Sequence, residues 1–296
     1  MAINISKSPI DHQNNIPVTY FKKEYIETQD YNQFISFSND DCFISFDLIE
    51  EKAISIPRSP FGSIFCMNQS INNSSVFLQK VLLELGRKNI KEIEIHLPPS
   101  IYDDFESAEL YVGSGFELSY SDLNQHIDLD NTWEKSIHKM QERKLSSLNS
   151  EGFVFRKMED NELEKAHNFI TVCRQAQGLQ INIPWNKLKS LNDSLTGEYE
   201  CFGVFRDEKI SAICIAVNVT SKIAYYYLPA TSPMFRNQSP MVLLIAGMVE
   251  YYRNKKYKYL DLGVSSSNGI TQETLKLFKE RMGAKSTEKP CLKLSL

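Results

Sequence analysis

The sequence predicts a mixed α/β (α+β) fold built from two similar tandem domains, at residues 1–150 and 151–296. Each domain is expected to be a mixed, largely antiparallel sheet flanked by helices. The length of 296 residues suits two domains of ordinary size. Strand and helix patterns alternate along the chain. A set of elements also recurs at a nearly constant interval, which takes Lys91 to Lys258 and Gly115 to Gly283.

The repeating unit is a strand, a Ser-Pro turn, a helix, a second strand and a short helix that ends at glycine. In the first half these elements are expected at 53–56, Ser59-Pro60, 76–88, 91–96 and before Gly115. In the second half they are expected at 223–228, Ser232-Pro233, 240–255, 259–264 and before Gly283. Similar units also recur by chance in α/β proteins, but the constant interval favours a duplication.

The remaining elements are predicted from hydrophobic periodicity. A helix at 132–149 joins the halves, and a strand at 152–156 opens the second one. A helix follows near 161–177, and Trp185 and Leu188 indicate another. Strands at 199–206 and 210–219 form the centre of the second sheet. The segment 11–33 shows no periodic pattern and yields no prediction.

Composition narrows the class of protein. The chain is 42% hydrophobic and 24% charged, with a formal net charge of -4, so a globular core is expected and a nucleic-acid-binding protein is disfavoured. No apolar run reaches the roughly 18 residues of a membrane span, and the N-terminus lacks signal-peptide features. Six cysteines are scattered without a CxxC motif, so we expect reduced core thiols in a cytoplasmic protein.

Two groups of motifs carry a family resemblance. The first is Tyr259-Leu260-Asp261-Leu262-Gly263, followed by Asn268-Gly269, Leu277-Phe278-Lys279 and Met282-Gly283-Ala284. The second is His126-Ile127-Asp128-Leu129, a basic helix and Gly152-Phe153. Both resemble Fem-type peptidyl aminoacyltransferases and the wider GNAT-like acyltransferases. Met282 stands where that pattern usually has phenylalanine. The space between Gly178 and Tyr199 is too short for the helical arm of Fem proteins, so the chain is similar to armless relatives.

The resemblance implies transfer of an acyl or aminoacyl group from acyl-CoA or a charged carrier to an amine acceptor. The acceptor would be a small molecule or peptide-like, held between the domains, and the donor would lie where two central strands part. Direct attack by the amine needs no enzyme nucleophile, and the chain has no GxSxG motif. The alternative is a binding protein that kept the fold and lost catalysis.

The resemblance also nominates site residues. Asp261 and Lys279 are the catalytic candidates, against the alternatives of a strand-end acid and a solvated lysine. Donor phosphates would lie at the start of the 240–255 helix, with Ser239 as N-cap, near Arg236, Asn237, Gln238 and Ser239. This loop lacks the glycines of coenzyme-A-dependent relatives, so an ordinary capped helix is the alternative. The candidate substrate-binding residues are Arg58, Ser59, Tyr227, Ser265 and Asn268.

The remaining candidates are a basic stripe and the histidines. Lys135, Lys139 and Arg143 follow a spacing of four along the predicted joining helix. They would contact phosphates of a carrier or tRNA, or form a solvated helix face. The five histidines lack the spacing of a metal motif, so no metal site is expected.

Overall fold

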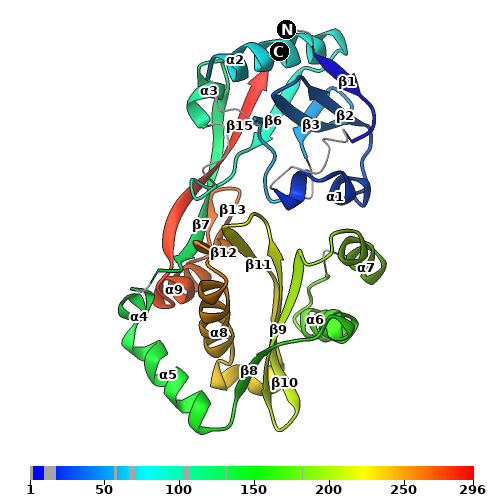
Figure 1. Cartoon of the computed structure of the whole chain (residues 1–296). Coiled ribbons are helices and arrows are strands. Elements are labelled where there is room, and N and C mark those ends of the chain that lie inside the picture. Colours follow the sequence, from blue (N-terminus) through cyan, green and yellow to red (C-terminus); the bar gives the residue numbers. More distant parts are fainter. Residues whose placement is uncertain are drawn as a thin grey trace.

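The protein is described by a computed structural model that covers residues 3–9, 18–56, 59–66, 71–102, 107–130, 132–181 and 183–296. Two lobes lie end to end along one continuous sheet, and the described chain begins and ends in the upper lobe (Figure 1). The fold is mixed α/β, with a large, mainly antiparallel sheet flanked by helices, as predicted.

The upper lobe is formed by the first half of the chain. Its elements are β1 (Asn4–Ser6), η1 (Thr19–Phe21), α1 (Lys23–Glu27), β2 (Phe34–Ser38), β3 (Cys42–Ile49), β4 (Lys52–Ser55), β5 (Phe65–Cys66), α2 (Ile71–Arg87), β6 (Glu92–His96), α3 (Ala108–Val112) and β7 (Glu117–Asp128).

The lower lobe follows after two short joining helices. The elements are α4 (Trp133–Ser136), α5 (Lys139–Ser150), β8 (Val154–Lys157), η2 (Asp160–Glu162), α6 (Leu163–Gln175), α7 (Trp185–Ser194), β9 (Tyr199–Arg206), β10 (Lys209–Asn218), β11 (Ile223–Thr231), η3 (Pro233–Gln238), α8 (Met241–Asn254), β12 (Tyr259–Val264), β13 (Ser266–Ser267), β14 (Ile270–Thr271), α9 (Glu273–Arg281) and β15 (Lys285–Ser295).

The two lobes share strands at the centre of the sheet. Within the described residues the strand order is β1-β2-β3-β4-β6-β15-β7-β12-β11-β10-β9-β8. The C-terminal strand β15 therefore lies between two strands of the first half, whereas β7 pairs with β12 of the second half. The division of the chain at residue 150 stays a prediction, and the sheet itself crosses it.

The register at this centre obeys the interval that the sequence predicts. In the first half the parallel pair β4–β6 ends at Ile54 and Glu94. In the second half the parallel pair β11–β12 ends at Tyr225 and Asp261. Asp261 follows Glu94 at the same interval at which Lys258 follows Lys91, so the two halves have the same strand pair at equivalent positions.

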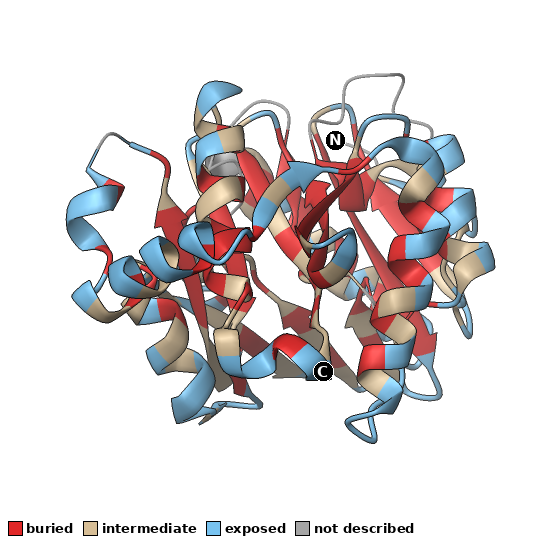
Figure 2. Ribbon diagram, turned by 90° about the horizontal axis from the view of Figure 1, so that it is seen from below, coloured by how far each residue is buried: buried red, intermediate tan, exposed pale blue. Residues whose placement is uncertain are grey.

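The described residues form three apolar clusters, one within each lobe and one between the lobes. One lies under α2 and α3 in the upper lobe, and a second lies between α8 and the lower sheet. The third crosses from one lobe to the other and contains Phe61 and Tyr102 of the first half with Leu163 and Ile215 of the second. Buried residues follow the strands and the inward helix faces (Figure 2). The third cluster fixes how the lobes face each other.

The joining segment differs from the prediction. The helix expected at 132–149 is two helices, because Ile137 and His138 adopt extended backbone conformations. The His138 N–H donates to the Arg281 carbonyl at 2.9 Å, and its ring nitrogen accepts from Met140 N–H. Lys135 therefore lies on α4 whereas Lys139 and Arg143 lie on α5, so the predicted three-residue stripe on one helix is wrong.

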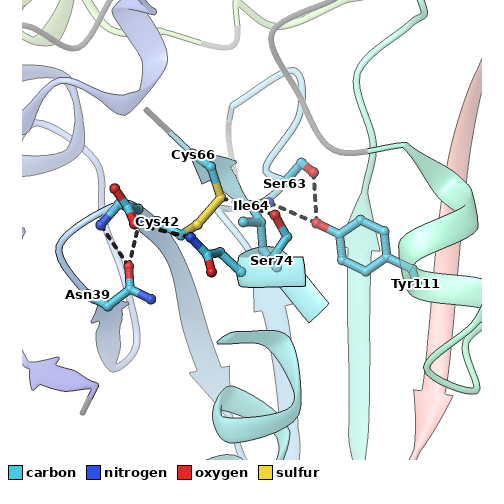
Figure 3. The surroundings of a disulfide bond; sticks show 9 residues. Asn39, Cys42, Ser63, Ile64, Cys66, Ser74 and Tyr111 are labelled. Carbon is cyan, nitrogen blue, oxygen red and sulfur yellow. Dashed lines mark hydrogen bonds between the residues drawn. A yellow bond between two sulfur atoms is a disulfide. The ribbon is translucent and has the colours of Figure 1, made fainter. Parts of the chain in front are cut away.

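The expectation of reduced thiols is wrong for two of the six cysteines. Cys42 and Cys66 are directly paired on β3 and β5 and form a disulfide. Figure 3 shows this bond near Ile64, which precedes β5, and there the Tyr111 hydroxyl hydrogen-bonds the Ser63 hydroxyl and the Ile64 N–H, each at 2.8 Å. The other four cysteines are free and buried. The sequence missed the pair because its partners meet only through strand register.

Among the described residues, no helix is long and apolar enough to cross a bilayer.

Candidate functional site

The site begins where β11 and β12 separate. The two strands pair for three residues and part after Tyr225 and Asp261. Gly263 follows with a φ of +73°, and a Cβ there would lie 3.0 Å from the Tyr225 ring. A left-handed backbone this close to an aromatic ring requires glycine. The conformation bends β12 away from its neighbour and opens a gap in the sheet.

A pocket of about 380 Å³ occupies this gap on the α8 side. Its walls come from β11, β12, α9 and the loop that precedes α8. They include Tyr226, Leu262, Leu275, Phe278, Lys279, Arg236 and Ser239. The pocket therefore joins one predicted catalytic residue, Lys279, to two predicted donor-binding residues.

The loop before α8 is built differently from the prediction. Ser239 is left-handed with a φ of 58°, and Pro240 is the N-cap without a side-chain capping bond. The Ser239 hydroxyl instead accepts a 3.0 Å hydrogen bond from Lys144 Nζ on α5. Ser239 as N-cap is thus a wrong prediction. The consequence is a second positive side chain, besides Arg236, beside the helix N-terminus that faces the pocket.

Asp261 lies in the sheet at the point of separation and is only 3% exposed. Its carboxylate accepts hydrogen bonds from three donors, at 2.8 Å from the Tyr102 hydroxyl and 2.9 Å from both Asn124 Nδ2 and Gly263 N–H. Three hydrogen-bond donors to one carboxylate fix its position and orientation. Because Tyr102 and Asn124 belong to the first half, this carboxylate binds the two halves together.

Lys279 is the second buried charge and is 4% exposed. Its Nζ donates to the carbonyls of Gly263 and Val264 at 2.8 Å and 2.9 Å. Burial lowers the pKa of Lys279 from 10.5 to about 8, although Asp261 acts in the opposite direction. An amine with this pKa is able to hold or release a proton near neutral pH.

A second pocket, of about 490 Å³, lies on the other face of β11. Tyr227 projects into it, whereas its neighbour Tyr226 lines the first pocket, since successive strand residues point to opposite faces. The remaining walls come from α1 of the first half and from α7 and the segment before it. They are Tyr25, Gln29, Gln180, Ile181, Ile183, Lys187 and Leu191.

The other predicted residues lie apart from these pockets. Ser265 is fully buried and donates to Gln125 Oε1 at 2.6 Å, and Ser59 donates to the Phe61 carbonyl at 2.7 Å, so both stabilise local structure. Asn268 is exposed in a left-handed turn. Asn237 is exposed, and Gln238 has a buried Oε1 without a partner among the described residues. Arg58 lies outside the described residues.

Sequence reasoning missed the residues that anchor Asp261. Asn124 lies on β7, a strand that the resemblance identified only by His126–Leu129. Tyr102 lies in a loop without a motif. One signal in the sequence pointed to Asn124. Asn124 and Cys291 are separated by the interval of the internal repeat, so they occupy equivalent positions, on β7 and β15. Tyr102 had no corresponding signal, because its contact depends on how the two lobes face each other.

Residues 138–269 match the family model of the acetyltransferase (GNAT) domain. This stretch is similar to acetyltransferase (GNAT) domains. The matched range contains β11, the loop before α8 and Asp261 on β12, whereas Lys279 follows it. No curated protein is significantly similar to the chain.

Several solved structures share this GNAT-like fold across most of the chain. FemX has 13% identity and a TM-score of 0.67, covering 93% of this chain and 91% of its own. The C-terminal domain of a protein from Agrobacterium fabrum, described as a putative lysylphosphatidylglycerol synthetase, has 13% identity and a TM-score of 0.61, covering 85% and 80%. L-PGS from Bacillus licheniformis has 12% identity and a TM-score of 0.60, covering 88% and 83%. The predicted fold and the resemblance to Fem-type GNAT proteins are confirmed.

Proposed function

We propose that this protein transfers an acyl or aminoacyl group from a phosphate-bearing carrier to an amine, with the donor in the pocket between β11 and β12. One observation carries the proposal: the strands part at Asp261, and the pocket so formed is bounded by the α8 N-terminus and Lys279. In the reaction the amine nitrogen bonds to the acyl carbon and loses a proton. The carrier's S–C or O–C bond breaks, and the carrier leaves protonated.

We place the donor in the second half because hydrogen bonds fill the equivalent gap of the first half. The equivalent gap after β4 and β6 is bridged by Gly62, whose N–H donates to the His96 carbonyl at 2.9 Å. The Ser55 hydroxyl also accepts from the His96 N–H at 3.0 Å. These bonds close the space that a donor would need. The proposed active domain is therefore 151–296, and the domain 1–150 contributes Tyr102 and Asn124.

The carrier is proposed to be held by its phosphates on side chains. Arg236 and Lys144 flank the start of α8, and exposed Lys139 and Arg143 extend this positive surface along α5. Cations at a helix N-terminus favour anionic groups. The loop has no glycine from Met234 to Pro240. Because a glycine-free loop exposes less backbone to a pyrophosphate, a charged carrier such as aminoacyl-tRNA fits this surface as well as acyl-CoA does.

The acceptor amine is proposed to approach through the second pocket, at Tyr227 and Tyr25. The two pockets lie on opposite faces of β11, so donor and acceptor would meet at the gap without competing for space. Lys279 would hold the proton released by the amine, and Asp261 would fix the bend of β12 through Gly263. A cytoplasmic location, where both carriers occur, belongs to this proposal.

Calorimetric titration of the full chain tests the proposal. The probes are acetyl-CoA, a long-chain acyl-CoA, a mixture of aminoacyl-tRNAs, and ATP as the nucleotide control. Arg236→Ala should weaken binding of the true donor by about 10-fold or more, the loss expected when a charged hydrogen bond is removed. Arg87→Ala, an exposed change on α2, is the matched control. If no donor binds, the binding protein without catalysis replaces the proposal.

A further inference from the structure

The upper lobe contains a cluster of metal-ligating side chains that the proposed function does not use. Glu94 and His96 lie on β6, two residues apart and therefore on one face of the sheet. Cys291 on β15 is the direct cross-strand partner of His96. One ligand atom from each of the three lies within 4.8 Å of the other two.

We propose that Glu94, His96 and Cys291 bind a zinc-class divalent metal ion. Carboxylate, imidazole and thiolate are all zinc ligands, and three protein ligands with a water in the fourth position make a tetrahedral site. The His96 side chain is 28% exposed and offers a path for the ion and for that water. Zinc displaces the thiol proton of Cys291, so one proton is released for each ion bound.

The surrounding contacts leave one oxygen of Glu94 available. Lys52 Nζ lies 2.7 Å from Oε2 and Lys293 Nζ lies 3.5 Å from the same atom. The other oxygen, Oε1, lies 2.8 Å from His96 Nε2. In zinc sites, ligands are oriented by hydrogen bonds to their outer atoms, and Lys52 holds Glu94 in this way. An ion between Oε1 and Nε2 would replace their direct contact.

The charges around the cluster are balanced as well. The positive charges of Lys52 and Lys293 are matched by Glu92 and Glu94, which they contact. Tyr120 is a hydrogen-bond partner of the Cys291 sulfur and so contacts one of the three ligands from outside the cluster.

The internal repeat places this cluster in the same position as the candidate catalytic site. Glu94 and Asp261 are equivalent positions of the repeat, and so are Asn124 and Cys291. In the second half the equivalent pair is linked by the 2.9 Å bond from Asn124 to Asp261. The four central strands β6, β15, β7 and β12 therefore carry both sets of groups. They present an amide and a carboxylate to one lobe, and a thiol, an imidazole and a carboxylate to the other.

Cobalt titration of the full chain tests the site, since Co²⁺ occupies zinc sites and reports its ligands optically. The wild-type chain should bind one equivalent of Co²⁺ with a thiolate-to-cobalt charge-transfer absorption, and Zn²⁺ should abolish that absorption. Cys291→Ser should lose the charge-transfer band. Cys173→Ser, which removes another buried free thiol, should keep it.

A second variant protects the test against misfolding. His96→Gln alters a partly exposed side chain and should lower Co²⁺ affinity by at least about 10-fold. Loss of a residue that only orients a metal ligand already lowers affinity by about this factor, so loss of a ligand should lower it by no less. Its thermal unfolding should match the wild type without metal. The proposal is overturned if the wild type binds no Co²⁺, or if Cys291→Ser keeps the charge-transfer band.

Discussion

The hydroxyl of Tyr102 donates a 2.8 Å hydrogen bond to Asp261, 159 residues further along the chain. Tyr102 belongs to the first half and Asp261 to the strand that bends at the candidate active site. The same carboxylate also receives Asn124 and Gly263. Residues of the other lobe therefore hold the bend of β12 beside the proposed donor pocket.

Removing the Tyr102 hydroxyl should destabilise the protein. Tyr102→Phe takes one donor from a buried carboxylate, and a hydrogen bond to a charged group contributes about 1.5–3 kcal/mol. The free energy of unfolding in urea should fall by that amount. Tyr20→Phe is the matched control, because the buried Tyr20 hydroxyl has no partner among the described residues. That substitution should be neutral or stabilising, and an equal loss in both variants would contradict the role given to Tyr102.

Lys279 should make stability depend on pH. Burial lowers the pKa of Lys279 from 10.5 to about 8. Between these values the unfolded chain binds more protons than the folded one, so the contribution of Lys279 to stability rises with pH. The difference in unfolding free energy between wild type and Lys279→Met should shift in favour of the wild type from pH 7.5 to pH 10.5. A difference that stays constant over this range would refute a lowered pKa.

The disulfide should contribute measurably to stability. Cys42 and Cys66 are 24 residues apart, and a loop of this size corresponds to about 3 kcal/mol in the chain-entropy model. The Cys42→Ser/Cys66→Ser variant should lose about that much in urea unfolding. Denatured, unreduced wild type should expose four alkylatable thiols, those of the free cysteines. Six reactive thiols would show that the bond is not formed in the isolated protein.

The glycine at the bend of β12 should be intolerant of side chains. Gly263→Ala places a Cβ 3.0 Å from the Tyr225 ring at a φ of +73°. Such strain costs on the order of 1–3 kcal/mol, and it acts where the donor pocket opens. Both unfolding free energy and donor affinity should fall. Gly178→Ala is the control, because its φ is also positive while no atom lies within 4 Å. It should lose stability without losing donor affinity.

Strand positions were the most predictable part of this fold. β9 and β12 begin and end at the residues that the sequence predicts, because both are short apolar runs bounded by turns. The repeat also predicted the equivalence of the two parallel pairs. The prediction of one joining helix was wrong, because the break at Ile137 and His138 depends on a contact with Arg281. Periodicity in one segment contains no information about such a partner.

The site was predicted only where its residues belong to one local motif. Lys279 was named from the run Leu277-Phe278-Lys279 and the loop before α8 from its place ahead of a predicted helix, and both line one pocket. The Asp261 network and the cluster of Glu94, His96 and Cys291 were missed, since each is assembled from strands distant in sequence. His96 and Cys291 lie in opposite halves of the chain and become neighbours only because β15 enters the upper lobe.

The central claim is that an acyl donor binds in the gap between β11 and β12. Two substitutions on α9 test it directly, because Leu275 lines the pocket whereas Leu277 lies outside it, and both are partly exposed. The measurement is the dissociation constant of the best-binding donor, by calorimetry, for wild type, Leu275→Trp and Leu277→Trp. Leu275→Trp should fill the pocket and weaken binding at least about 10-fold, a cost of roughly 1.4 kcal/mol, while Leu277→Trp should bind as wild type does. Equal affinity in all three proteins would place the donor elsewhere and contradict the account.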